Sequence, residues 1–152
     1  MTVKEKTMVR AFAPAINHIS APTHVAGSLN KMFKALHERD AQVLKMRFGL
    51  DKHEKHTLEA IGQEFGITRE RVRQIENAAI AKLSEVLSAD LSQILNQAEK
   101  ILSARGGVLI KNNMLRELLT CINSDSETDM RYLELALMTS ANIVTVHNTI
   151  KF

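Results

Sequence analysis

Several residue types are scarce in this chain of 152 residues, and each scarcity excludes a class of protein. A single cysteine, Cys121, excludes an intramolecular disulfide framework and suits a reducing compartment, where we expect it to act as a small buried hydrophobe. No apolar run approaches the roughly 18–20 residues of a membrane span, and no secretory signal is visible. We therefore expect a cytoplasmic protein with no membrane partner.

Signatures of enzymes are equally scarce. The six glycines form no phosphate-binding loop, and no nucleophile motif is present. His53 and His56 flank Glu54 with the loose spacing of a metal-binding pair, but a zinc site needs three or four fixed ligands and the neighbouring sequence offers no others. A solvated loop is the favoured interpretation, so we expect a non-enzyme with no catalytic residue, metal or cofactor.

The chain does have a balanced globular composition. Hydrophobic residues make up 45% and charged residues 24%, which fits one domain or two small ones. The net charge of +3 permits nucleic-acid binding without proving it.

Residues 57–76 form the most informative segment and predict two short helices joined by a tight turn. Gly66 supplies the positive φ that such a turn needs, and Gly62 lies one helical turn earlier, where a side chain would push the second helix away. Thr57 and Thr68 are placed to cap the two helices. Two facing apolar stripes have helical spacing: Leu58, Ile61 and Phe65 in one, and Ile67, Val72 and Ile75 in the other. The segment therefore predicts a helix-turn-helix.

The second helix of this pair begins with five polar side chains suited to DNA. They are Arg69, Glu70, Arg71, Arg73 and Gln74. An ordinary amphipathic helix pair with a solvated face is the alternative, but it gives no reason to crowd these residues at one helix end. The pattern favours a recognition helix that enters a DNA major groove.

Five segments follow one family pattern: Leu36–Asp40, Val43–Leu50, Thr57–Gly62, Gly66–Glu76 and Ala79–Leu83. With them, the chain resembles region 4 of the sigma-70 family of bacterial transcription initiation factors from about residue 28 to residue 83. The resemblance covers a little over a third of the chain. It is specific, because a generic helix-turn-helix would not share the Arg47-Phe48-Gly49-Leu50 segment.

This resemblance implies recognition of double-stranded promoter DNA. In the family the domain reads the −35 element, and the matching base-reading positions are Arg69, Glu70 and Gln74. Their chemistry fits, since arginine pairs with guanine, glutamate accepts from cytosine and glutamine pairs with adenine. Phosphate contacts are expected from six residues: Arg39, Arg47, Thr57, Thr68, Arg71 and Arg73.

The resemblance also implies a protein partner. Region 4 binds the flap of the RNA polymerase β subunit through apolar residues of its first helices, and some of the matching residues are expected to be plain core. The matching positions are Met32, Phe33, Leu36, Val43 and Leu44. We therefore expect RNA polymerase as a partner and a location at the nucleoid.

One part of a sigma factor has no counterpart here. Region 2 grips polymerase and melts promoter DNA with aromatic side chains, whereas this chain has no Trp, one Tyr and nothing resembling that region. We expect a DNA-binding transcription factor that is not a complete sigma factor.

The chain is expected to have three parts and a mainly α fold. Residues 1–27 contain both prolines and are interpreted as a flexible arm with a short helix near residues 8–12. Residues 28–87 form the helix-turn-helix domain, whose recognition helix is expected to run on toward Leu87. Residues 88–152 are expected to form a winged-helix-like α+β domain with a small hairpin.

This last part predicts three helices and a hairpin. A first helix stops at Gly106-Gly107, and residues 108–110 form a strand. Asn112-Asn113 are placed to cap a helix over 114–121, and a third helix spans 131–139. Strands at 143–146 and 149–152 complete the hairpin. The order of elements resembles winged-helix modules of the HARE-HTH type, and because the last strand ends the chain, the domain is expected to be incomplete at its C-terminus.

The candidate recognition helix of the winged-helix-like part is acidic. Glu127, Asp129 and Glu134 face Arg131 alone, a charge balance that would repel phosphate. A protein contact or a homodimer through residues 88–152 is favoured over a second DNA reader.

Three hypotheses remain for the whole chain. It docks on polymerase and reads a −35-like element, or it is a stand-alone dimeric regulator, or it occupies the flap site without reading DNA. The presence of Arg69, Glu70 and Gln74 argues against the third.

Overall fold

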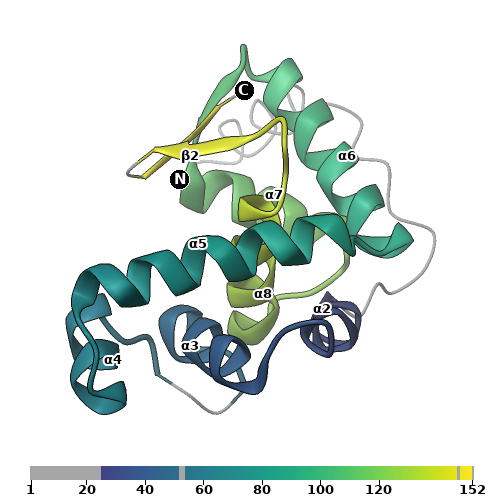
Figure 1. The fold of residues 1–152 in the computed structure, drawn as a ribbon. Helices are drawn as coiled ribbons and strands as arrows, with labels where there is room; N and C mark the ends of the chain where they lie inside the picture. The colour runs from purple at the N-terminus through teal and green to yellow at the C-terminus, as the bar shows by residue number, and fades with distance from the viewer. Residues whose placement is uncertain (1–24, 52–53, 147, 152) are drawn as a thin grey trace.

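The computed structural model describes residues 25–51, 54–146 and 148–151. Its helices and strands are α2 (Val25–Phe33), α3 (Glu38–Phe48), α4 (Leu58–Phe65), α5 (Arg69–Glu85), α6 (Ala89–Ala104), β1 (Val108–Ile110), α7 (Lys111–Cys121), α8 (Glu127–Met138), β2 (Val144–Val146) and β3 (Thr149–Lys151) (Figure 1). The predicted mainly helical fold with a small hairpin is confirmed. None of these helices is long and apolar enough to cross a membrane.

The predicted boundary of the N-terminal arm is wrong. Helix α2 begins at Val25, before the predicted end of the arm at Gly27. Val25 is fully buried and anchors the helix, while Gly27 lies on its solvent side. The short helix predicted near residues 8–12 lies outside the described residues.

Two helices in the C-terminal part begin earlier than predicted. Helix α7 begins at Lys111, so Asn112 and Asn113 lie in its first turn instead of capping it. Helix α8 begins at Glu127, because the Ser126 hydroxyl caps it by accepting a hydrogen bond from a backbone N–H in its first turn. Both differences extend a helix by less than one and a half turns and leave the predicted order of elements intact.

The helix-turn-helix has its own small core. Val43, Met46, Ile61, Val72 and Ile75 are buried together, and the stripe residues Leu58, Phe65 and Ile67 pack at its margin. Both predicted apolar stripes therefore meet, with α3 closing the third side. Gly66 ends α4 at φ 64, as the turn requires.

A second and larger core joins the two halves of the chain. It contains Leu29 and Phe33 of α2, Leu83 of α5, Leu102 of α6 and Leu133 of α8. Helix α8 packs on both α2 and α3, and α6 packs on α2. The boundary proposed at residue 87 falls in the turn between α5 and α6, and hydrophobic packing continues across it.

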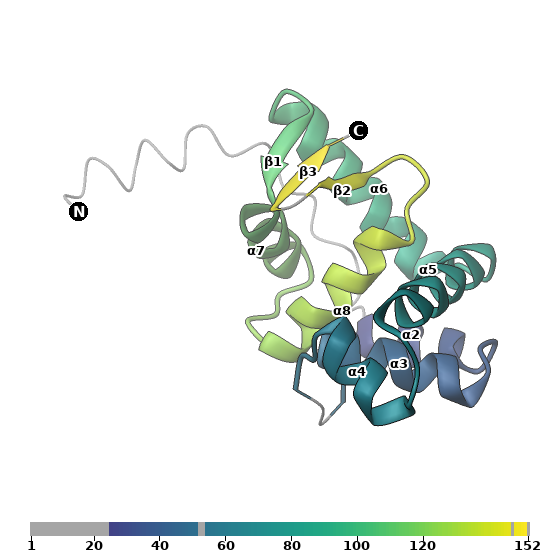
Figure 2. The same cartoon turned by 60° about the vertical axis from the view of Figure 1, so that its left-hand side comes forward.

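A three-stranded antiparallel sheet closes the C-terminal half. Strand β3 lies in the middle, between β1 and β2, with Leu109, Ile150 and Thr145 in register across it. The order α6, β1, α7, α8, β2, β3 is that of a winged helix. Figure 2 shows the sheet beside α6 and α7, at the end of the molecule opposite α4. The sheet is therefore far from the helix-turn-helix.

Candidate nucleic-acid interface

Two threonine caps fix the geometry of the helix-turn-helix. The Thr57 hydroxyl accepts a hydrogen bond from the backbone N–H of Ala60 at 3.1 Å, and the Thr68 hydroxyl accepts one from Arg71, also at 3.1 Å. Each satisfies one of the free N–H groups at a helix start. The hydroxyl hydrogens stay available, so both threonines are placed at positive helix ends that attract phosphate.

Gly62 sets the distance between the two helices. A Cβ atom at this position would lie 2.7 Å from the carbonyl oxygen of Ile67, a backbone atom that cannot move aside independently. The N–H of Ile67 donates to the carbonyl of Gly62 at 2.9 Å, so the chain passes directly over this glycine. The close approach predicted at Gly62 is confirmed.

The predicted base-reading side chains all lie on the exposed N-terminal part of α5. Arg69, Glu70 and Gln74 are exposed, as are Arg71 and Arg73 between them. The opposite side of the same helix carries Val72 and Ile75 into the small core. Burial of one side therefore presents the other to solvent, as a recognition helix requires.

Ion pairs and hydrogen bonds along α5 orient two of these side chains. Arg73 donates to both carboxylate oxygens of Glu70, at 2.9 and 2.7 Å, and Arg71 donates to the amide oxygen of Gln74 at 3.1 Å. The hydrogen bond from Arg73 is the main reason that the pKa of Glu70 lies below its ordinary value. Glu70 therefore stays ionised and can accept a hydrogen bond. These pairings were not predicted from the sequence, although the i,i+3 spacing of Glu70 and Arg73 indicates such an ion pair.

Arg39 and Arg47 of α3, two of the predicted phosphate contacts, have partners outside α3. The guanidinium of Arg39 lies 5.6 Å from the centre of the Phe65 ring, a cation–π distance. Arg47 pairs with Glu76 of α5 at 3.4 Å and donates to the carbonyl of His56 at 3.2 Å. Arg39 remains exposed, whereas Arg47 is partly buried and ties α3 to α5.

Glu76 is a buried carboxylate within the recognition helix. Burial raises its pKa above the ordinary value, and the neighbouring Arg47 guanidinium offsets part of that rise. Removing Arg47 would leave this buried charge without its main partner, so we expect Arg47 to contribute to folding.

The predicted polymerase-binding residues are mostly core in this conformation. Met32, Phe33 and Leu44 belong to the large core and Val43 to the small one, while Leu36 is partly buried. Helix α8 packs on the two helices that carry them. Met32, Phe33 and Leu44 are therefore brought together and covered, whereas Val43 lies in the other core.

Sequence reasoning missed the residues that hold this cover. Arg131 donates to the carbonyl oxygen of Gly49 at 2.8 Å, and Tyr132 donates to Asp51 at 2.7 Å. Glu134 pairs with Lys55 at 2.5 Å. The lone Tyr of the chain, set in an acidic helix, was the one available signal.

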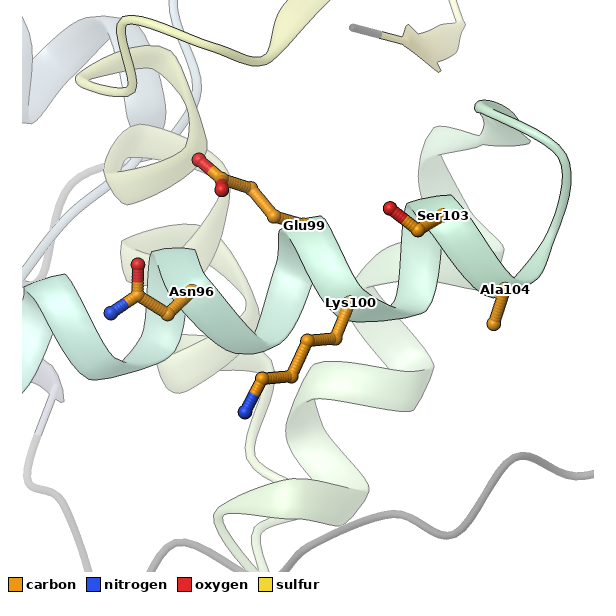
Figure 3. A pocket seen from close by; sticks show the side chains of 5 residues that line it. All are labelled: Asn96, Glu99, Lys100, Ser103 and Ala104. Carbon is orange, nitrogen blue, oxygen red and sulfur yellow. The ribbon is translucent and has the colours of Figure 1, made fainter.

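Among the described residues, no group of three or more His, Cys, Asp and Glu side chains could hold a metal ion, and His53 lies outside them. A shallow hollow on α6 is lined by Asn96, Glu99, Lys100, Ser103 and Ala104. Figure 3 shows that Glu99 and Lys100 point in opposite directions, and Glu99 accepts a hydrogen bond from Asn142.

Comparison with known proteins places the similarity on this interface. The family model described as "Sigma-70, region 4" matches residues 32–85. The RNA polymerase sigma factor RpoD of Neisseria gonorrhoeae is 41% identical over 83 residues, which cover 47% of this chain and 13% of the relative. The RNA polymerase sigma factor SigA of Lactococcus lactis subsp. cremoris is 53% identical over 55 residues, covering 36% of this chain and 15% of the relative. SigA of Lactococcus lactis subsp. lactis gives 53% over 55 residues and 14% of its length. The helix-turn-helix is thus similar to sigma region 4, and the chain spans about a seventh of these relatives.

Proposed function

We propose that this chain is a sequence-specific DNA-binding transcription factor that inserts α5 into the major groove of a −35-like promoter element. The observation that carries the proposal is the exposed start of α5, where Arg69, Glu70 and Gln74 are all exposed on a capped helix. Arg69 would pair with guanine, Glu70 with cytosine and Gln74 with adenine. The role requires binding alone, without a catalytic group, metal or cofactor, and belongs in the bacterial cytoplasm at the nucleoid.

Preorganisation supports this assignment. Glu70 held by Arg73 and Gln74 held by Arg71 present fixed acceptors before DNA arrives, which lowers the entropy lost on binding. Thr57, Thr68 and Arg39 flank them and would contact phosphate. Arg71 and Arg73 would contact phosphate from the same helix.

A lone helix-turn-helix covers too short a site for high specific affinity. We therefore include docking on the β flap of RNA polymerase in the proposal, because tethering raises the effective concentration of α5 at the promoter. A pull-down with polymerase that has or lacks the flap tip tests this part. Retention that requires the flap tip supports docking, and retention without it argues for a stand-alone regulator.

The base-reading assignment is tested by fluorescence anisotropy with a −35-like duplex and a scrambled duplex at several salt concentrations. The unchanged chain should prefer the −35-like duplex, and Arg69→Ala or Gln74→Ala should each remove about 1–3 kcal/mol of that preference. Arg39→Ala is the matched control: it should weaken both duplexes equally and reduce the salt slope by about one. Equal binding of both duplexes by the unchanged chain would contradict the assignment of these residues to base reading.

A stand-alone dimeric regulator is the second candidate, favoured by one observation. Val108, Ile110, Val144 and Val146 expose 55, 52, 47 and 38% of their surface. The strand register places all four on the outer face of the sheet. Such a patch is typical of an interface, and a second copy would cover it. Sedimentation showing a monomer at micromolar concentrations would rule this candidate out.

A further inference from the structure

Helix α8 covers an apolar surface that we call the α2–α3 face. It consists of Val25, Leu29, Met32 and Phe33 of α2 together with Leu44 and Phe48 of α3. All six are buried, and they share one core with Tyr132 and Leu133 of α8. Helix α6 also packs on α2, so without α6 and α8 this surface would be a large exposed apolar patch, which a monomer rarely tolerates.

The occupant of this face is itself a helix. Figure 1 shows α8 lying between α5 above and α2 and α3 below, and Figure 2 keeps it beside α3 and α5. In a winged helix, the helix at the position of α8 is the one that reads DNA. Here α8 instead packs against other helices of the same chain. The α2–α3 face therefore has the shape to bind an amphipathic helix.

Polar contacts surround the apolar centre of this interface. Tyr132 donates to Asp51 at 2.7 Å and to Asn30 at 3.2 Å, and Arg131 donates to the carbonyl oxygen of Gly49 at 2.8 Å. Lys55 reaches Glu134 across the same boundary. These residues are 79 to 102 positions apart in the chain.

Three of the four charged members of these contacts have a second partner on their own side. Asp51 pairs with Lys45 at 2.8 Å, Glu134 with Lys111 at 2.8 Å, and Arg131 with Glu127 at 2.6 Å. Separating α8 from α2 and α3 would thus leave each of these charges paired. A boundary whose charges keep a partner when it opens lacks the usual penalty of breaking a buried salt bridge.

The turn that joins the two halves lies partly at the surface. Residues 86–88 form the turn between α5 and α6, and Val86 exposes 41% of its surface. A cavity of about 290 Å³ lies between α2 and this turn, lined by Met32, Val86 and Asp90 among others. The turn therefore borders open space on one side, while the hydrogen bond from Ser28 to Asp90 at 3.0 Å links α2 to the start of α6 beside it.

We propose that residues 89–151 act as a detachable cover, in which α8 occupies the α2–α3 face until a partner helix displaces it. The inference rests on the proposed function, in which that partner is the flap-tip helix of RNA polymerase. The cover pivots at residues 86–88 and exposes Met32, Phe33 and Leu44, the positions matched to flap binding. Binding of the partner and binding of α8 are mutually exclusive.

Population arithmetic makes the effect measurable. When only a fraction of molecules is open, the apparent affinity for the partner falls by that fraction, so a tenfold weaker cover gives about tenfold tighter binding. Variants that loosen the cover should therefore bind more tightly than the unchanged chain, which is the reverse of an ordinary loss-of-contact mutation.

The test measures binding of the full chain to a polypeptide carrying the flap-tip helix of the β subunit. The double variant Arg131→Ala/Tyr132→Phe removes three hydrogen bonds to the opposite half while keeping the ring volume of residue 132. It should bind the flap polypeptide about tenfold more tightly. Lys55→Ala loosens the same boundary from the other side, through an exposed side chain, and should tighten binding less. Thr128→Ala, on the exposed side of α8, should match the unchanged chain.

Circular dichroism and binding to the −35-like duplex verify that each variant is folded. Tighter flap binding by both loosened variants supports the cover. Equal binding by all forms overturns the cover and leaves flap docking standing. Absence of flap binding in every form overturns both, because an open α2–α3 face would then accept no helix.

Discussion

Two glycines at the turn of the helix-turn-helix have different physical roles. Gly66 needs a positive φ of 64 but has open space around its Cα, since a methyl group at this position would meet no atom within 4 Å. Gly62 has helical backbone angles, and its constraint is the Ile67 carbonyl oxygen, which would lie 2.7 Å from an added Cβ atom. One glycine is required by conformation and the other by contact.

This difference predicts different outcomes for the same substitution. Gly62→Ala should destabilise the fold by about 1–3 kcal/mol through overpacking. Those molecules that remain folded should also bind DNA more weakly, because the added methyl group displaces α5. Gly66→Ala should cost about 1–2 kcal/mol through its left-handed backbone and leave DNA affinity intact, and Gly66→Asn should recover part of the loss. Urea denaturation and anisotropy measure the two effects. Equal loss of DNA affinity in both alanine variants would contradict the assigned roles.

At the scale of single elements, α8 carries a built-in reporter. Tyr132 is the only tyrosine and the chain has no tryptophan, so phenolate absorbance and intrinsic fluorescence both arise from this residue. Burial raises the pKa of Tyr132 to about 12, and its hydrogen bond to the Asp51 carboxylate adds to the rise.

The raised pKa predicts that α8 loosens in alkali. Because the folded pKa exceeds the unfolded value of about 10, the stabilisation is fully present below pH 10 and is lost as the pH rises through about 12. Absorbance titration should give a midpoint near 12, and stability should fall over the same range. Tyr132→Phe is the control, since it should give no phenolate signal and a flatter stability profile. A midpoint near the unfolded value would mean that Tyr132 is not buried against Asp51.

Glu134 behaves in the opposite sense at the same boundary. Burial alone would raise its pKa, but hydrogen bonds from Lys111 and Lys55 outweigh burial and hold it below the ordinary value. Its contribution is therefore present at neutral pH and lost as the pH falls through the folded pKa. Acid and alkali act on this boundary through different residues.

Helices α4 and α5 could be predicted from the sequence because their determinants are local. Thr57, Gly62, Gly66 and Thr68 act on atoms no more than five residues away, so spacing alone identifies the caps and the turn. The burial of α8 could not be predicted in this way. Tyr132 meets Asn30 across 102 residues, and no local pattern specifies such a partner.

The site was predicted in the same uneven way. The exposed positions of Arg69, Glu70 and Gln74 follow from helical periodicity, whereas the Arg47–Glu76 pair depends on how α3 crosses α5. A family pattern marks Arg47 without saying whether its guanidinium faces solvent or a buried carboxylate.

At the scale of the whole molecule, one large core connects both halves. Leu29 and Phe33 near the start of the described residues are buried with Leu102, Leu133 and Ile150 near the end. An open cover would be a minor state of a chain whose halves otherwise unfold together.

Because the core is shared, we expect a destabilising substitution in α6 to destabilise the helix-turn-helix as well. Ile94 is fully buried, and Ile94→Ala should cost about 2–5 kcal/mol. Circular dichroism and Tyr132 fluorescence should show one transition that shifts as a unit, with DNA binding lost at the same temperature. Gln93→Ala, at the neighbouring exposed position, should shift neither. Two separate transitions in the Ile94 variant would show that the halves fold independently.

The distance between α5 and α8 along the chain has a consequence during synthesis. Translation proceeds at about 5–20 residues per second, so the roughly 50 residues from the end of α5 to the end of α8 take about 3–10 s to emerge. Throughout that interval the recognition helix is complete while the α2–α3 face has no α8 to lie on. The α2–α3 face of a nascent chain is therefore exposed during this interval. A partner helix that is already near the ribosome would bind this face before α8 of the same chain is synthesised.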